Sequence, residues 1–330
     1  MGLQNGFLYQ NDFLFVCFSV MIELKGICGG VCMSNYGKIE ELKAPNKTMS
    51  MVVLAMALVY NVIFGFIRNP AETDNTLSWL GYDYPHGFLM WGVLTAAAFF
   101  LNIIYLYKKF GYSGRVGTAF AIAAIFFMPG VVFINDWGWE QTAHLIATLI
   151  FIALNAIAIL MFFIHNYKKH IKYRLTTFLV ILILAGMILV QFTLGKSGLL
   201  ELVPLWLAML LLFVSNFTSF YPVYPCDKAQ TQKKKNVRTA LKLACTLGVF
   251  GAHNLYLNRI YKGAGQLVMS ITGIFLCLIP VIGMGYVNDI SEGDAKVCIA
   301  AGISFLSGAA VWAARDIYRL KQLKSIENFE

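Results

Sequence analysis

Residues Leu175–Leu194 read LTTFLVILILAGMILVQFTL, which is twenty positions without a charged side chain. A helix that crosses the hydrocarbon core of a bilayer needs about 20 mostly apolar residues. Inside lipid the backbone can satisfy its hydrogen bonds only in a helix or a closed barrel. Barrel strands alternate apolar with polar residues, and this stretch does not. The sequence therefore predicts a transmembrane helix here.

Similar apolar runs recur along the chain, so we expect an all-α, polytopic integral membrane protein with eight spans. The composition agrees, because 58% of the 330 residues are hydrophobic and only 13% are charged. A soluble domain carries about a quarter charged residues. The other seven predicted spans are Met49–Ile67, Gly87–Tyr107, Val116–Ile134, Thr142–Ile164, Leu199–Tyr221, Gly263–Val287 and Val297–Ala314.

The charges of the loops predict the orientation of the chain. Lys and Arg collect after the second, fourth, sixth and eighth spans, whereas the opposite loops are acidic and poor in Lys and Arg. Basic loops stay on the cytoplasmic side. Eight spans therefore place every basic loop and both termini in the cytoplasm. The net charge of +9 is then a topology signal and does not indicate nucleic-acid binding. Short loops and the lack of a targeting signal favour a bacterial plasma membrane.

The segment Leu241–Leu257 is apolar but short, and it carries Lys242, His253 and Asn254. As a full span it would place the basic tail, Arg315–Lys324, outside the cell, against the charge rule. We therefore expect a re-entrant or interfacial half-span that enters from the cytoplasmic side. A nine-span protein is the alternative.

These features divide the chain into four parts. The N-terminal segment contains either an over-long start, residues 1–32, or an interfacial helix. The polar linker carries Lys233, Lys234 and Lys235, for which we expect contact with anionic lipid headgroups of about 1 kcal/mol per basic residue, or a topology signal alone. The parts are residues 1–48, the N-terminal segment; 49–221, a six-helix bundle; 222–238, the linker; and 239–330, a C-terminal module with a basic tail.

The C-terminal module carries a recognisable pattern. Residues 248–259 read GVFGAHNLYLNR, residues 263–267 read GAGQL, and residues 312–316 read WAARD. This pattern resembles the TM-two family of two-transmembrane-helix domains, which have paired glycines, an Asp-Arg-Phe-type motif, a Tyr, a Gly-Arg turn and a final Trp-x-x-x-Asp. Asn254 and Leu255 replace the family's Arg-Phe pair. The matching positions are Gly248, Gly251, His253, Tyr256, Arg259, Trp312 and Asp316.

The resemblance extends over roughly Asn236–Leu320 and implies a pair of membrane helices without implying a reaction. Asp316 lies four residues after Trp312, so the two share a helix face. An acid near the end of a span is expected to find a cation. We predict that His253 or Arg259 approaches Asp316, the alternative being pairing with neighbouring arginines or solvation at the interface.

A second group of polar residues lies on the predicted outer side, at His86, Asp136, Glu140 and His144. Histidine with carboxylates can bind zinc or perform acid–base chemistry. Two histidines fall short of the three protein ligands of a catalytic zinc site, so we favour polar caps within a tryptophan belt and expect no metal or cofactor. Within the spans, Asn61, Asn102, Asn155 and Gln191 are expected to form interhelical hydrogen bonds.

Three hypotheses for function follow from this pattern. The chain contains no nucleotide-binding loop, nucleophile elbow or His-Glu-x-x-His motif, which favours a non-enzymatic scaffold or partner-binding protein. A transporter or lipid-handling protein built on the six-helix bundle is the second hypothesis. A metal-dependent membrane hydrolase at the outer histidine and carboxylate cluster is the third.

Overall fold

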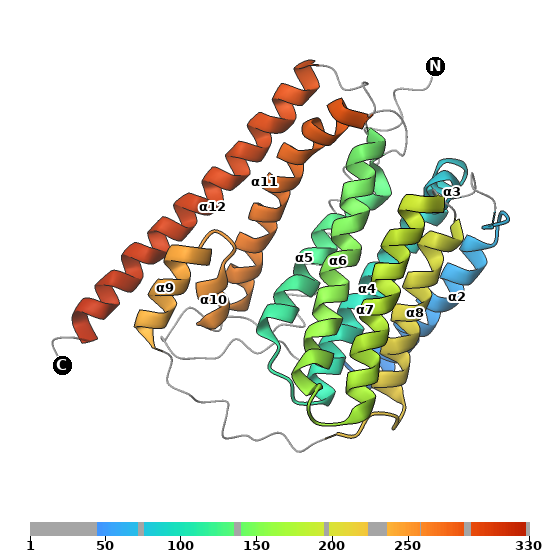
Figure 1. The fold of residues 1–330 in the computed structure, drawn as a ribbon, viewed down its shortest axis with the longest axis horizontal. Helices are drawn as coiled ribbons and strands as arrows, with labels where there is room; N and C mark the ends of the chain where they lie inside the picture. The colour runs from blue at the N-terminus through green and yellow to red at the C-terminus, as the bar shows by residue number, and fades with distance from the viewer. Residues whose placement is uncertain are drawn as a thin grey trace. The chain divides into compact units, whose positions relative to one another are not determined.

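The computed structural model describes residues 45–71, 76–134, 140–194, 198–223, 236–257, 259–286 and 292–327. All regular structure in these ranges is helical, which confirms the all-α expectation (Figure 1). Residues Pro45–Glu330 form one compact unit. The helices are α2 (Lys47–Gly65), α3 (Leu77–Asp83), α4 (Pro85–Lys109), α5 (Arg115–Phe133), α6 (Glu140–Asn166), α7 (Ile171–Leu194), α8 (Gly198–Phe217), α9 (Val237–Leu247), α10 (Ala252–Tyr256), α11 (Ile260–Tyr286) and α12 (Glu292–Glu327).

Seven helices are long and apolar enough, over their described residues, to cross a membrane. They coincide with seven of the eight predicted spans, and the 24-residue α7 covers the remaining one. The chain is therefore a multi-pass membrane protein, as predicted. The seven candidate spans are Lys47–Gly65, Pro85–Lys109, Arg115–Phe133, Ala143–Asn166, Gly198–Phe217, Ile260–Val281 and Ala295–Gln322.

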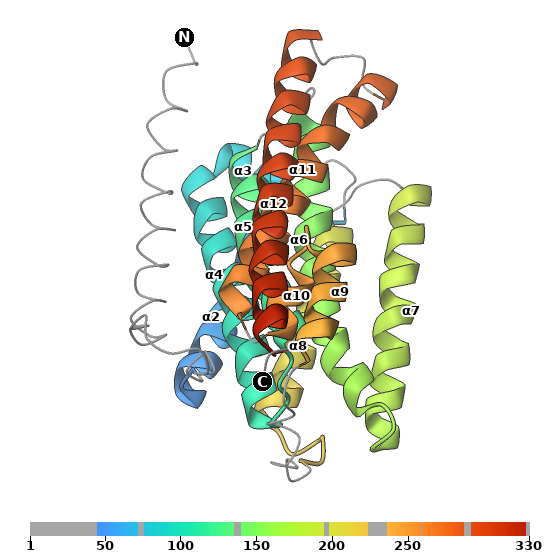
Figure 2. The same cartoon turned by 90° about the vertical axis from the view of Figure 1, so that its left-hand side faces the viewer.

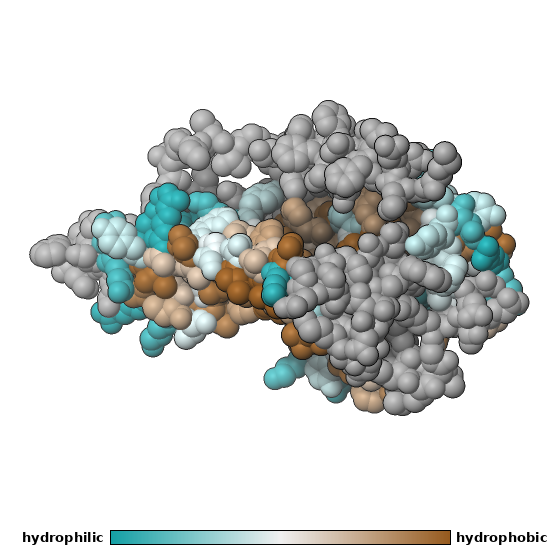
Figure 3. Space-filling model, turned by 90° about the horizontal axis from the view of Figure 1, so that it is seen from above, coloured by the Kyte–Doolittle hydropathy of each residue, from teal (hydrophilic) through white to brown (hydrophobic). Residues whose placement is uncertain are grey.

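Apolar side chains of the described residues reach the surface of the molecule, as lipid requires (Figure 3). Helix α7 lies at one edge of the bundle and illustrates this arrangement (Figure 2). Its outward side chains include Leu175, Phe178 and Leu182, all of which are exposed. In a soluble protein such a surface would cause aggregation, whereas in a bilayer it faces lipid tails.

The six-helix bundle is held together by buried amides as well as by apolar packing. Asn61 Nδ2 donates to Thr95 Oγ1 over 3.2 Å, and Asn102 Nδ2 donates to the Ser50 carbonyl over 3.1 Å. The predicted interhelical bonds are thus confirmed for Asn61 and Asn102. The prediction is wrong for Asn155, whose amide donates to the Phe151 carbonyl of its own helix. The Gln191 side chain lies outside the described residues.

Basic side chains at the end of the bundle have a structural role. Lys109 Nζ donates to the carbonyls of Ser215, Asn216 and Thr218 over 2.8–3.2 Å, where α8 ends. The last carbonyls of a helix lack partners and carry partial negative charge, so a lysine there satisfies both needs. Lys109 is one of the basic loop residues that predict the topology, and it also caps the end of α8.

The nine-span alternative gains no support from the described residues, because no single helix covers Leu241–Leu257. The 11-residue α9 is about 16 Å long and ends at the turn Gly248–Gly251, beyond which the five-residue α10 begins. The hydrocarbon core is about 30 Å thick. The entry of this segment from the cytoplasmic side stays a prediction. The following helix, α11, packs against α5, with the rings of Phe275 and Phe127 in edge contact at 6.1 Å.

Candidate functional site

The turn between α9 and α10 depends on Gly251. Its φ of +75° lies in the left-handed region, which side chains with a Cβ rarely adopt. A Cβ at this position would lie 2.5 Å from the Gly263 carbonyl oxygen in α11. The backbone of the turn therefore lies directly against α11. This close approach fixes the position of α10, which carries the next residues of the motif.

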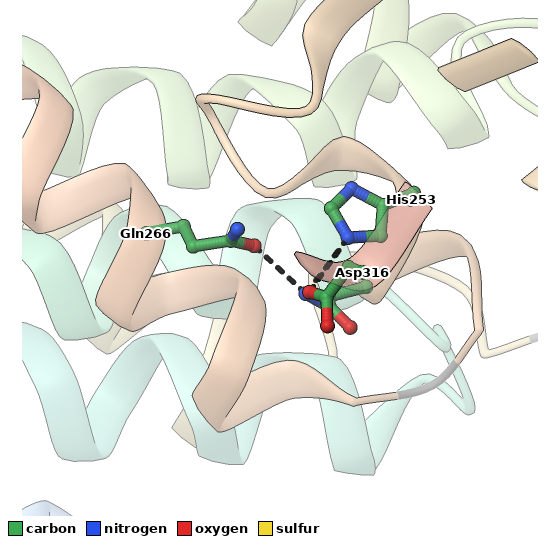
Figure 4. A network of polar contacts seen from close by, with 4 residues as sticks. His253, Gln266 and Asp316 are labelled. Carbon is green, nitrogen blue, oxygen red and sulfur yellow. Dashed lines mark hydrogen bonds and ion pairs between the residues drawn. The ribbon is translucent and has the colours of Figure 1, made fainter. Parts of the chain in front are cut away.

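Four buried polar side chains meet where α10, α11 and α12 join (Figure 4). His253 Nε2 lies 3.0 Å from Asp316 Oδ2, and Asn254 Nδ2 donates to the same oxygen over 2.8 Å. Asn254 Nδ2 also donates to Gln266 Oε1 over 2.7 Å. We call these four residues the buried polar cluster. His253, Asn254 and Gln266 are fully buried, and Asp316 is 5% exposed.

The predicted approach of His253 to Asp316 is confirmed. Solvation of Asp316 at the interface is wrong, because its carboxylate is buried. His253 Nε2 also lies 3.1 Å from Asn254 Nδ2, so this nitrogen donates to the carboxylate in the tautomer that carries its proton there and accepts from the amide in the other. An isolated buried charge costs several kcal/mol, which two converging donors offset in part. The cluster therefore tolerates a carboxylate only while its three helices stay together.

Three polar atoms of the cluster are buried without a hydrogen-bond partner among the described residues. They are His253 Nδ1, Asn254 Oδ1 and Gln266 Nε2. Such atoms are uncommon in native proteins and mark strain or function. The sequence placed Gln266 within the family pattern without a role, and it marked Asn254 as a polar residue of a short apolar segment and a departure from the family motif. A signal was present, since a glutamine inside an apolar run needs a polar partner.

The remaining motif residues build the surroundings of the cluster. The Tyr256 hydroxyl accepts from the Asn236 N–H over 3.2 Å, and the side chain packs against Ala240, Ala244 and Leu320. Arg259 contributes its backbone N–H, which donates to the Asn254 carbonyl over 2.8 Å. A Cβ on Gly265 would lie 3.5 Å from the Trp312 ring. A Cβ on Gly248 would lie 3.2 Å from the Ala313 Cβ.

A comparison with known protein families finds a match in this region. The family model of the TM2 domain matches residues 233–284. No curated protein and no solved structure matches the chain. The matched range includes α9, α10 and most of α11, and it confirms the resemblance noted in the sequence. Asp316 lies beyond that range, yet it binds His253 and Asn254 inside it. Helix α12, outside the matched range, thus supplies the carboxylate of a cluster whose other three side chains lie within it.

The predicted outer cluster is only partly described, because Asp136 and the side chain of Glu140 lie outside the described residues. His86 is exposed at the start of α4, whereas His144 is buried and contacts Ser78. Among the residues that the structure describes, no group of three His, Cys, Asp or Glu side chains could hold a metal ion. The metal-dependent hydrolase hypothesis therefore gains no support from them.

Proposed function

We propose that the protein is a membrane scaffold in which α12, the helix that packs beside the TM2 domain, docks against a helix of a partner inside the bilayer. The observation that carries this proposal is the exposure of α12. Only 17% of its apolar stretch is buried within the chain, compared with 56% for α4. The side chains of the buried polar cluster point away from the outer face of α12, and that face is largely exposed among the described residues.

The composition of that outer face supports a protein partner. Membrane helices associate through small residues that let backbones approach closely. The inner face of α12 already uses this device, since the Gly302 backbone packs against the Gly273 carbonyl of α11. The outer face carries further small side chains at helical spacing, and all of them are exposed: Ala300, Ser304, Ser307 and Ala314.

Photo-crosslinking in native membranes tests this proposal. A photoreactive residue at Ser304 or Ser307 is expected to give a discrete protein adduct. The matched control is Phe178 on α7, which is 68% exposed and should give lipid adducts alone. Ser307→Phe should then weaken the α12 adduct by closing the groove between small side chains. Lipid adducts alone from both helices would contradict a partner at α12.

We also propose that both termini are cytoplasmic and that the cytoplasmic end of the TM2 domain contacts anionic headgroups. The start of α9 and the end of α12 pack together through Ala240 and Leu320. Basic residues near the bilayer surface contribute about 1 kcal/mol each toward anionic lipid. Lys233, Lys234 and Lys235 lie outside the described residues. Exposed basic side chains at this end are Arg238, Lys242, Arg315, Arg319 and Lys321.

Reporter fusions after Lys324 and within residues 288–296 test the orientation. A cytoplasmic reporter at the first site and an external reporter at the second are expected from the loop charges. An external tail would overturn both the orientation and the lipid contact. A bacterial plasma membrane stays the predicted location.

A further inference from the structure

A small cavity lies in the six-helix bundle, away from the TM2 domain. Its volume is about 70 Å³, and residues of α3, α4, α5, α6 and α8 line it. Most of the lining is apolar and includes Phe88, Trp91 and Leu205. Ligand sites are usually apolar cavities of about 300–1,000 Å³ with a few converging polar groups, so this smaller cavity can enclose only one end of a ligand. The polar side chains that line this cavity are Ser78, His144, Thr148 and Glu201.

Ser78 and His144 are paired in a defined orientation. His144 Nδ1 lies 3.1 Å from the Ile134 carbonyl oxygen, which can only accept, so Nδ1 carries the proton. In the neutral ring Nε2 is then an acceptor. Ser78 Oγ lies 3.1 Å from Nε2 and donates its proton toward it. This is the arrangement of a serine nucleophile with a histidine base held by a third group.

We propose that Ser78 and His144 form an acyl-transfer site for carboxylic esters with an apolar acyl chain. The pair is 7% and 6% exposed, so both side chains are withheld from bulk water yet line the cavity. The Thr148 hydroxyl is buried without a hydrogen-bond partner among the described residues. It lies one turn after His144 on the same face of α6 and supplies a donor for the oxyanion.

Glu201 acts as a positioning residue in this arrangement. Its Oε2 accepts the Leu77 N–H over 2.8 Å, which ties α8 to the residue before Ser78. The site thus brings together side chains from α3, α6 and α8. Its surroundings are independent of α12, so the proposal goes beyond the scaffold function and does not rest on it.

The reaction balances with water as the acyl acceptor. Ser78 Oγ bonds to the ester carbonyl carbon while His144 Nε2 takes the hydroxyl proton. The carbon–oxygen bond to the alcohol then breaks, and the departing alcohol takes the proton from Nε2. Water attacks the acyl-serine by the same route, which releases the carboxylic acid and restores Ser78. The apolar lining selects the acyl part, and the small volume admits a short chain or the first carbons of a longer one.

An alkyl fluorophosphonate carrying a fluorophore tests this proposal on the full chain in detergent or nanodiscs. The folded protein is expected to be labelled, with the modified peptide mapped by mass spectrometry to Ser78. Ser78→Ala should abolish labelling, and His144→Gln should slow it at least about 100-fold. Thr148→Val should slow it about 100-fold through loss of the oxyanion donor. Ser113→Ala, at an exposed serine between α4 and α5, is the matched control and should label at the parent rate.

Mapping the label in the parent chain keeps the test decisive if a variant fails to fold. Hydrolysis of p-nitrophenyl butyrate by the parent, and its loss in Ser78→Ala, would be the second supporting result. Labelling at other residues alone, or none where a reference serine hydrolase in the same bilayer is labelled, would overturn the proposal. Ser78 and His144 would then be a structural pair that joins α3 to α6.

Discussion

The six-helix bundle and the TM2 domain bury polar side chains in opposite ways. In the bundle, single amides such as Asn61 and Asn102 bond to neutral groups of adjacent helices at separate places. Where the TM2 domain meets α12, a carboxylate, an imidazole and two amides meet at one point. Hydrogen bonds between neutral groups, such as those of Asn61 and Asn102, contribute modestly to the free energy of unfolding, each independently of the others. A buried carboxylate makes its helices interdependent, because separating them leaves a charge without donors.

The largest effect should come from breaking the cluster itself. Asp316→Leu removes the shared acceptor and leaves the His253 and Asn254 donors buried without it. We expect a loss of about 3–5 kcal/mol in the free energy of unfolding. Asp83→Ala is the matched control, since Asp83 forms an exposed ion pair with Arg68 and should cost under about 1 kcal/mol.

The local consequence of Asp316→Leu can be followed at Cys277. Its sulfur packs against Gly302 where α11 and α12 cross, and it is a free thiol. Separation of the two helices should raise its rate of maleimide alkylation, whereas the Asp83→Ala variant should keep the parent rate. Equal stability of the two variants would show that the carboxylate does not couple the helices.

The second effect concerns the turn that delivers His253 to the cluster. Gly251→Ala places a Cβ in the left-handed region and against the Gly263 carbonyl, so we expect a loss of about 1–3 kcal/mol. Gly186→Ala in α7 provides the contrast, because a Cβ there meets nothing within 4 Å. That change should be neutral or stabilise the helix by up to about 1 kcal/mol. Thermal unfolding of both variants measures the difference, and similar losses would contradict the role of the turn.

The sequence predicted the spans well because lipid imposes a simple requirement of length and apolar composition. Asp316 and His253 could be paired in advance, since each bears an ionisable group near a helix end. The partners of Gln266 and Ser78 could not be predicted, because neither side chain is ionisable and their partners depend on tertiary packing. The family motif gave no role to Asn254, because this residue replaces the family's Arg. Its amide nevertheless lies at the centre of the buried polar cluster and bonds to Gln266 and Asp316.

The third prediction concerns Asn102 in the six-helix bundle. Asn102 links three helices, since it donates to the Ser50 carbonyl and its own oxygens accept from Asn216 Nδ2 at 3.0 and 3.2 Å. Asn102→Ala should cost about 0.6–1.7 kcal/mol, the range typical of such bonds in membranes. Denaturant unfolding in mixed micelles measures it. A loss as large as that of Asp316→Leu would remove the distinction between the two regions.

The smallest effect is expected at Asn155, which matches Asn102 in residue type and in burial. Its amide donates over 3.0 Å to the Phe151 carbonyl, four residues earlier in the same helix. A backbone carbonyl at that position already accepts the N–H of the helix ladder, so the side-chain bond adds little and joins no second helix. Asn155→Ala should therefore change the free energy of unfolding by less than about 0.5 kcal/mol. If the loss instead equalled that of Asn102→Ala, side-chain burial rather than interhelical bonding would explain the polar residues of the bundle.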